Sequence, residues 1–479
     1  MSTKKLVISI IAIVLAAGSL VAMSQSSRAV TMMDQMNEYT RKSLDQYRIP
    51  GASAIIQKDG QTALDASWGE TSRGDEVTGD TPFLVGSLSK SMTATAILML
   101  VQDGKVTLDE PIGTYIPEFR YASIDNTQIT VRHLLLQTSG ISPMDGLNVT
   151  DREYSNDDGI TQAVGYLKGI TLLSKPGDQY RYTSANYLLL GAIIQSVSGQ
   201  PFAEFLERQL FDPLKMNSTS ADLAGSLADG LQPGHDSWLG YPISSNGFYD
   251  AAGAPYGYIS STANDMTKFL KFMQTGEGIL DQQRMQLLQQ VPAGDRTYGF
   301  GWHYSKDGKY FYHGGATPGF RAEMFYYLDR DFSGVILTNK YHSLEDQQVS
   351  DIMAGIRTIA DGQNPPVLPA ADRSIQLGIA GVLVALIVSL TMMIVRYVRY
   401  RTYGRIWKKV IGAILIVVAI GFVFAVPYIF GAPWHSVLLF AADVGYMSIL
   451  LSILLAINGM VLFLNQRQKS STGKRLRTK

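Results

Sequence analysis

The chain has 479 residues, of which 41 are Lys or Arg, 41 are Asp or Glu and none is Cys. Because the charges balance, bulk electrostatics gives no reason to expect nucleic acid or another polyanion as a partner. The lack of cysteine excludes disulfides, thiolate metal sites and a cysteine nucleophile, so packing must hold the fold together.

The first residues have the pattern of a secretory signal. Leu6 to Ser27 carries no charge and follows Lys4 and Lys5. A short apolar segment behind basic residues is typical of a signal peptide or of an uncleaved signal anchor. We assign residues 1–28 to one of these two, and both stay open because small residues near Ala22 permit cleavage without requiring it.

Residues 29–361 are expected to form one large α+β domain. β-Prone runs at Ala52 to Gln57 and Thr62 to Trp68, separated by Lys-Asp-Gly, predict a hairpin. Helical spacing of apolar residues predicts helices at Ser87 to Gln102, Tyr187 to Val197 and Pro201 to Leu210. The runs K-Y-F-Y-H-G-G, A-E-M-F-Y-Y-L-D and S-G-V-I-L-T-N then predict three successive strands. Strands at both ends predict an antiparallel sheet in which the chain ends meet, flanked by helices and joined to an all-helical part.

The C-terminal part contains three apolar stretches. Ile375 to Val395 and Val410 to Phe430 each have the roughly 20 residues that a helix needs to cross a bilayer core. A third stretch, Trp434 to Leu464, contains Asp443. This carboxylate is either an intramembrane proton or ion site, since a charge is costly there, or an interfacial residue near the end of the span. We assign three transmembrane helices to residues 374–465.

Basic residues predict the orientation of these helices, because segments rich in Lys and Arg favour the cytoplasmic side. They are Arg396, Arg399, Arg401, Arg405, Lys408 and Lys409 after the first helix, and Arg467, Lys469, Lys474, Arg475, Arg477 and Lys479 at the end. We therefore assign 466–479 to a basic cytoplasmic tail and place the domain 29–361 outside the cell. Residues 362–373, which contain Pro-Pro-Val-Leu-Pro, predict an extended linker.

The first candidate catalytic residue is Ser87, which has Lys90 three positions later. Helical residues at this spacing share a face, so the amine can touch the hydroxyl and activate it as a nucleophile. A motif with only two fixed positions also occurs by chance. The alternative is that Ser87 caps the helix and that Lys90 is a solvated lysine. A base and oxyanion donors must therefore come from elsewhere in the chain.

Two later segments offer such partners. The run Arg-Tyr-Thr-Ser-Ala-Asn places Tyr182 and Ser184 directly before an apolar helix. The run Phe-Tyr-His-Gly-Gly-Ala places His313 before two glycines on a predicted strand, where a substrate backbone can approach closely. The alternatives are a packed aromatic residue at Tyr182 and a structural histidine at His313.

In this order, S-x-x-K, Y-x-(N or S) and (K or H)-x-G resemble the motifs of the penicillin-recognising serine hydrolases, specifically the class C β-lactamase and D-Ala-D-Ala carboxypeptidase-like branch. Other stretches that resemble this family begin at Ile49 (I-P-G-A-S-A), Thr130 (T-V-R-H-L-L-L-Q-T-S-G-I), Tyr187 (Y-L-L-L-G), Tyr256 (Y-G-Y-I-S-S-T-A-N-D-M), Tyr298 (Y-G-F-G-W) and Val335 (V-I-L-T-N). The resemblance covers about Asn37 to Asn339 and stops before the C-terminal helices. It implies a β-lactamase/transpeptidase-like fold for the outer domain.

The resemblance also implies roles for the matched residues. Ser87 would be the acylated nucleophile, Lys90 its partner, and Tyr182 the general base that takes the hydroxyl proton and later activates water. An ammonium beside a phenol favours the phenolate, so we expect Lys90 to lower the pKa of Tyr182. The backbone N–H groups of Ser87 and of Ala316 would form the oxyanion hole.

Residues expected at the substrate and the oxyanion are Ser184, His313, Gly315 and Ala316. Two of these depart from the family's pattern, because the family usually has asparagine at the position of Ser184 and lysine at that of His313. A lysine is a fixed positive charge suited to a substrate carboxylate, whereas a histidine is mostly neutral at pH 7. Carboxypeptidase, esterase and β-lactamase activities all stay open.

We therefore expect a membrane-bound extracytoplasmic serine hydrolase, forming an acyl-enzyme on Ser87, that acts on D-amino-acid peptides such as peptidoglycan stem peptides or on small esters or amides. The alternative is a module that binds or senses wall fragments or β-lactams and is coupled to the membrane segment. Neither H-E-x-x-H nor G-x-S-x-G occurs, and we expect no metal or organic cofactor. Histidines without paired ligand spacing, assigned as structural or surface residues, are His133, His235, His303, His342 and His435.

Overall fold

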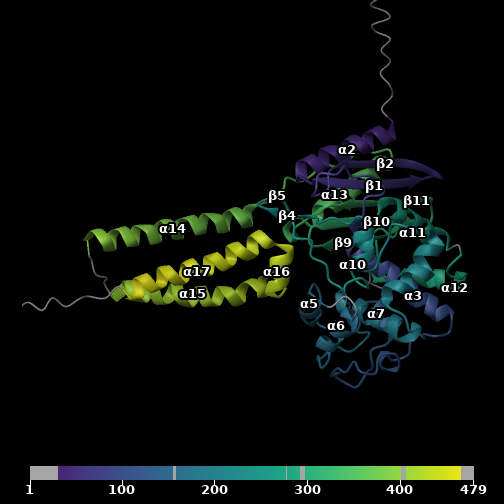
Figure 1. The fold of residues 1–479 in the computed structure, drawn as a ribbon, viewed down its shortest axis with the longest axis horizontal. Coiled ribbons are helices and arrows are strands. Elements are labelled where there is room, and N and C mark those ends of the chain that lie inside the picture. Colours follow the sequence, from purple (N-terminus) through teal and green to yellow (C-terminus); the bar gives the residue numbers. More distant parts are fainter. Residues whose placement is uncertain (1–30, 155–157, 277, 292–296, 401–405, 465–479) are drawn as a thin grey trace, which may run out of the picture.

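The computed structural model of the protein describes residues 31–154, 158–276, 278–291, 297–400 and 406–464. The segment 1–28 and the tail 466–479 lie outside the described residues. Figure 1 shows an outer domain from which long helices extend to one side.

The central sheet joins the two ends of the outer domain. Its strand order is β2-β1-β11-β10-β9-β8-β7, with antiparallel neighbours. The strands are β1 (Gly51–Lys58), β2 (Gln61–Gly69), β7 (Tyr298–Gly299), β8 (Trp302–Tyr304), β9 (Tyr310–Thr317), β10 (Phe320–Tyr327) and β11 (Phe332–Thr338). Ala54 pairs with Ile336, which confirms that the strands from the two ends of the domain meet.

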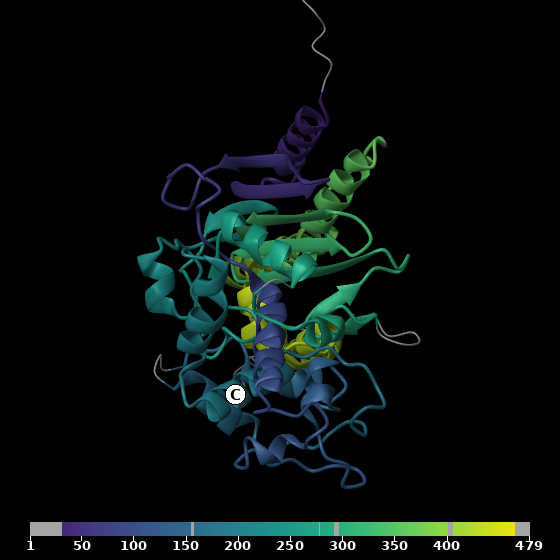
Figure 2. The same ribbon diagram turned by 90° about the vertical axis from the view of Figure 1, so that its right-hand side faces the viewer.

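Both faces of this sheet are covered. Alternate residues of a strand point to opposite faces. Accordingly, Ile55 packs in the cluster that contains Phe269 of α11 (Ala263–Thr275), whereas Ile56 packs in the cluster of α2 (Met32–Tyr47) and α13 (Gln347–Ala360). Figure 2 shows the sheet in the upper half of the domain and a group of helices below it. The fold is the predicted α+β arrangement.

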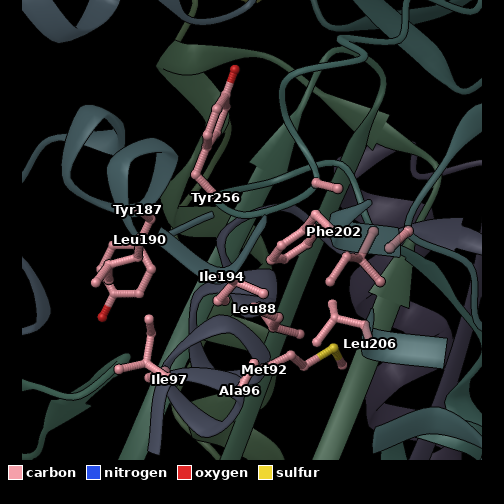
Figure 3. Close-up of a cluster of buried hydrophobic side chains, with 14 of the residues drawn as sticks. Leu88, Met92, Ala96, Ile97, Tyr187, Leu190, Ile194, Phe202, Leu206 and Tyr256 are labelled. Atoms are coloured by element: carbon pink, nitrogen blue, oxygen red, sulfur yellow. The ribbon is translucent and has the colours of Figure 1, made fainter. Parts of the chain in front are cut away.

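The all-helical part is built around α3 (Ser89–Gln102), which is buried without interruption from Ser89 to Leu98. Figure 3 shows Met92 and Ile97 of this helix among side chains of α7 (Ser184–Ser198) and α8 (Phe202–Leu206). The other helices are α4 (Val131–Leu135), α5 (Pro143–Val149), α6 (Gly159–Leu167), the π-helix η3 (Glu207–Phe211), α9 (Asp212–Leu214), α10 (Leu223–Ala228) and α12 (Gln282–Leu288).

Small elements complete the domain. They are the two-stranded pair β3 (Phe83–Leu84) and β6 (Ser260–Ser261), the sheet β12-β4-β5 formed by β4 (His235–Trp238), β5 (Tyr241–Ser244) and β12 (Lys340–Tyr341), and the 3₁₀ turns η1 (Gly86–Leu88), η2 (Ile112–Thr114) and η4 (Ser343–Glu345). The predicted helix from Ser87 thus begins with a 3₁₀ turn, and regular α-helix starts at Ser89.

Three C-terminal helices are long and apolar enough to cross a membrane: α14 (Ser374–Tyr400), α15 (Ile406–Phe430) and α17 (Ala442–Leu464). They lie side by side in Figure 1. The third apolar stretch differs from the sequence expectation, because it divides at Ala441 into the short helix α16 (Trp434–Phe440) and α17. Ala441 has φ −150° and ψ 57°, which is outside the helical region and turns the chain between them.

Candidate active site

Ser87 and Lys90 are in direct contact at the start of α3. Ser87 lies in η1, and Lys90 Nζ lies 2.8 Å from Ser87 Oγ and 2.7 Å from the carbonyl oxygen of Tyr256. Lys90 is completely buried, and the lost hydration of its ammonium lowers its pKa to about 7. Near pH 7, Lys90 is therefore a neutral amine in a large share of the molecules, and this amine can accept the proton of Ser87.

Aromatic rings surround the amine. Lys90 Nζ lies 5.0 Å from the ring centroid of Tyr182, 5.8 Å from that of Tyr187 and 5.9 Å from that of Tyr256. Ring faces attract a cation, so they partly offset the cost of burying the ammonium. Both protonation states of Lys90 are thus accessible, as a group that first takes and then returns a proton requires.

Tyr182 is hydrogen-bonded to Ser87, but its acidity is opposite to the sequence expectation. Burial raises the pKa of Tyr182 above its ordinary value, and the hydrogen bond from Ser87 opposes this only in part. We expected Lys90 to lower this pKa. Desolvation of the phenolate dominates, and the groups that lower this pKa are Ser87 and Arg321 rather than Lys90. Tyr182 therefore rests as a phenol, and Lys90 is the stronger candidate for the base.

A polar network holds the Tyr182 segment in place. The side-chain oxygen Oε1 of Gln137 accepts hydrogen bonds from the Thr183 backbone N–H at 3.0 Å and from Asn186 Nδ2. Asn186 in turn accepts a 2.6 Å bond from Ser139. This arrangement brings Ser184 Oγ to 3.4 Å from Lys90 Nζ, so that Ser184 lies with the catalytic pair.

Two glycines let the nucleophile turn pack directly against β9. A Cβ on Gly86, which has φ 59°, would lie 2.2 Å from the Ala316 nitrogen. A Cβ on Gly315 would lie 2.0 Å from the Val85 oxygen and 2.9 Å from the Ser87 nitrogen. Because neither glycine carries a side chain, the backbone segments that contain the Ser87 and Ala316 amides lie in close contact. This is the arrangement that two oxyanion donors need.

His313 is buried on β9 beside these amides. Its Nδ1 lies 2.7 Å from the Gly314 carbonyl oxygen, which only accepts, so Nδ1 carries the proton and Nε2 can accept from the Tyr298 hydroxyl at 3.4 Å. Burial, then His303 and Lys90, lower the pKa of His313 well below its ordinary value. The position thus offers a neutral group to a substrate, unlike the family's lysine.

Sequence reasoning missed His303, which lies in the site. Its ring is 5.0 Å from that of His313 and stacks on Tyr182 at 6.1 Å. Burial lowers the pKa of His303 to about 4, so it is neutral as well. The run Tyr-Gly-Phe-Gly-Trp was noticed in the sequence, and its last residue, Trp302, begins β8. His303 is the next residue on this strand, and that position was the available signal.

Arg321 was also missed. It is buried and donates from Nη1 to the Gly315 carbonyl oxygen at 3.2 Å, which braces β9 behind the oxyanion site. Its place follows from the cross-strand pairing of Ala316 with Arg321, which no local motif announces. Within the described ranges, no group of three or more His, Asp or Glu is arranged to hold a metal ion.

Comparison with known proteins identifies the family of this chain. The family profile described as Beta-lactamase matches residues 36–354. The chain belongs to the beta-lactamase family. It is 25% identical over 313 residues to Protein flp of Staphylococcus aureus (strain N315), covering 64% of this chain and 62% of that relative. The chain thus spans less than two thirds of the length of that relative.

Other similar proteins have different names. Esterase EstB of Burkholderia gladioli is 28% identical over 325 residues, covering 60% of this chain and 80% of the esterase. Among solved structures, the octameric penicillin-binding protein homologue from Pyrococcus abyssi aligns with a TM-score of 0.59 and 22% identity, over 69% of this chain and 77% of that one. The likeness in three dimensions establishes the β-lactamase-like fold.

Proposed function

We propose that this chain is a membrane-bound serine hydrolase that works through an acyl-enzyme on Ser87. The observation that carries this proposal is the 2.8 Å contact between Ser87 Oγ and the buried Lys90 Nζ. A serine hydroxyl is a weak nucleophile unless a base removes its proton. A lysine with a pKa of about 7 is such a base at neutral pH.

The reaction follows from the positions of these groups. Lys90 takes the Ser87 proton while Oγ attacks the substrate carbonyl carbon, and the new oxyanion accepts hydrogen bonds from the Ser87 and Ala316 amides. When this tetrahedral intermediate collapses, the bond to the leaving group breaks, and the leaving group receives the proton through Tyr182. Water then attacks the Ser87 ester and gives its proton to the same Tyr182 and Lys90 pair. The bond to Ser87 Oγ breaks, this oxygen takes that proton back, and the acid is released.

The substrates are D-amino-acid peptides, such as peptidoglycan stem peptides, or small esters and amides. Support comes from the names of similar proteins, an esterase and a penicillin-binding protein homologue. The neutral His313 favours esters and amides that lack a carboxylate, because no fixed cation stands at that position. β-Lactams acylate Ser87 in this proposal, and turnover of the adduct separates a β-lactamase from a peptidase.

The catalytic domain faces the outside of the membrane. Three helices of membrane-crossing length support the attachment, and the basic residues between α14 and α15 support the orientation. The protein is then a multi-pass membrane enzyme whose active site is extracytoplasmic.

The test is the intact mass of the full chain, solubilised in detergent, after reaction with a fluorescent penicillin or with p-nitrophenyl acetate. Wild type is expected to gain the mass of the acyl group or to turn over the ester, and Ser87→Ala to do neither. Ser196→Ala, a serine of α7 that bonds to the Tyr115 carbonyl oxygen, is the matched control and should react like wild type. Folded wild type that reacts with neither reagent would overturn the hydrolase.

That negative result would favour a binding or sensing module. A specific observation keeps this second candidate: the outer domain is joined to the membrane helices by a buried contact, in which Asp443 Oδ1 accepts from His342 Nε2 at 2.8 Å. Such a contact can transmit a ligand-induced change in the domain to α17.

A further inference from the structure

A cavity of about 870 Å³ lies between the outer domain and the membrane helices. Its membrane side is lined by Leu438 and Leu439 of α16 and by Tyr446 of α17. Its domain side includes Trp238, which stacks on Tyr446 at 6.0 Å, and Ile243 on β5. The volume falls within the roughly 300–1,000 Å³ of small-molecule sites in proteins.

The cavity lies where a bilayer would end. Helix α17, which is long and apolar enough to cross a membrane, begins at Ala442, and Ala442 lines the cavity. The β4–β5 hairpin beside it exposes 56% of Tyr241 and 49% of Ile243. Exposed aromatic and aliphatic side chains next to a membrane helix are typical of contact with the lipid interface. The cavity is therefore placed to receive an apolar chain from the edge of the bilayer.

Part of the cavity wall is formed by residues that are close in sequence to the candidate active site, or that pack on such residues. The cavity is lined by Pro318, two residues beyond the oxyanion donor Ala316. Tyr249 and Phe248 also line it, and their rings pack on Tyr258 at 5.6 and 6.1 Å. Tyr258 is close in sequence to Tyr256, whose carbonyl oxygen holds Lys90. The cavity is thus lined by the residue that follows β9 and by rings that pack next to the segment holding Lys90.

The lining also has a charge preference. Glu153 and Asp236 line the cavity, and among the described residues that line it none is Lys or Arg. An anionic head group would meet these carboxylates without a compensating cation, which disfavours it. The groups that fit are a hydrocarbon chain together with a neutral or cationic head.

We propose that this cavity receives the hydrocarbon chain of an amphiphilic ester or amide drawn from the outer leaflet, and so presents its carbonyl to Ser87. This inference rests on the proposed hydrolase and specifies its substrate class. Ser87 Oγ attacks the carbonyl, the ester or amide bond breaks, and the alcohol or amine leaves with a proton. The hydrocarbon chain belongs either to the acyl part or to the leaving group, and two series of esters distinguish these cases.

The experiment uses full-length protein in nanodiscs of neutral phospholipid and two series of soluble esters. One series is p-nitrophenyl esters from acetate to octanoate, and the other is acetate esters of alcohols of increasing length. Each methylene that enters an apolar site from water favours binding by about fourfold. In the series that matches the substrate, we expect kcat/KM to rise about 10-fold or more from the shortest to the longest chain.

Variants connect this preference to the cavity. Ile243→Asn and Tyr446→Ala alter side chains that are about half exposed and line the cavity, so both variants should fold. In each we expect the long-to-short ratio of kcat/KM to fall about fivefold, with the value for the shortest ester within about twofold of wild type. Ile124→Asn, at an exposed residue that does not line the cavity, is the matched control and should keep the wild-type ratio.

The outcomes separate the two proposals. If Ser87 turns over short esters but neither series shows a chain preference, or if the preference survives in both cavity variants, the inference is wrong and the hydrolase stands. If short esters neither react nor label Ser87, the hydrolase fails and the inference fails with it. A preference in the acyl series places the chain on the acid, and a preference in the alcohol series places it on the leaving group.

Discussion

At the scale of single residues, the proposed mechanism makes the reaction of Ser87 depend on the protonation of Lys90. Burial lowers the pKa of Lys90 from 10.5 to about 7, so the amine is neutral above that pH and an ammonium below it. We predict that the rate of Ser87 acylation by p-nitrophenyl acetate falls about tenfold per pH unit below pH 7 and levels off above about pH 8. Stopped-flow measurement from pH 5 to pH 9 tests this.

Tyr182→Phe is the control for this pH dependence. In the proposed mechanism Tyr182 relays the proton and Lys90 is the base. The variant should therefore react more slowly, while the midpoint of its pH–rate profile stays near pH 7. A midpoint that moves with this substitution, or a wild-type rate that still rises steeply near pH 10, would contradict the assignment of Lys90 as the base.

We expect His313 to control the preference for charged substrates. Its imidazole is neutral, and His313→Lys places a cation where the family usually has one. We predict that the ratio of acylation by penicillin to acylation by p-nitrophenyl acetate rises about tenfold, since a substrate carboxylate gains a partner. His313→Gln stays neutral and should leave the ratio unchanged. Equal ratios in the two variants would show that charge at this position does not select the substrate.

At the scale of elements, the close packing of η1 on β9 brings together the backbone segments that we expect to form the oxyanion site. A Cβ on Gly315 would approach the Val85 oxygen to 2.0 Å, so Gly315→Ala must push the turn away from the strand. We predict a loss of about 10²-fold in acylation, the usual cost of losing one oxyanion donor. Gly113→Ala, where a Cβ meets nothing within 4 Å, is the control. Near-normal acylation by folded Gly315→Ala would exclude this role.

The sequence predicted these elements better than it predicted their contacts. Helical periodicity placed a helix at Ser87 to Gln102, and β-prone runs placed the strands β9, β10 and β11. The 3₁₀ turn at Gly86 was not predictable, because it depends on packing against Ala316 far along the chain. Arg321 escaped for the same reason, since its partner is the Gly315 carbonyl on a neighbouring strand.

At the scale of the whole molecule, the number of membrane-crossing helices follows from length and composition, but their attachment to the domain does not. Asp443 allowed two interpretations in the sequence, an intramembrane site or an interfacial residue. In the structure it is buried and accepts from His342 Nε2 at 2.8 Å and from the Leu239 backbone N–H at 2.8 Å. His342 lies 101 residues away in the chain, so no local pattern could reveal the pair.

The contact between Asp443 and His342 should hold the β4–β5 hairpin against α17. Asp443→Ala leaves His342 Nε2 and the Leu239 N–H without their acceptor, a cost of about 1–3 kcal/mol for each buried group. We predict that amide hydrogen exchange speeds up about tenfold or more at Leu239 and in the hairpin, but not in β9 to β11. Ser452→Ala, which removes a hydroxyl bonded within α17, is the matched control and should leave exchange in the hairpin unchanged.

Unchanged exchange in the hairpin of Asp443→Ala would mean that other contacts, such as the stacking of Trp238 on Tyr446, suffice to join the two parts. Because the hairpin also forms the domain wall of the cavity, Asp443→Ala should reduce the preference for long-chain esters while Ser87 still accepts the shortest one.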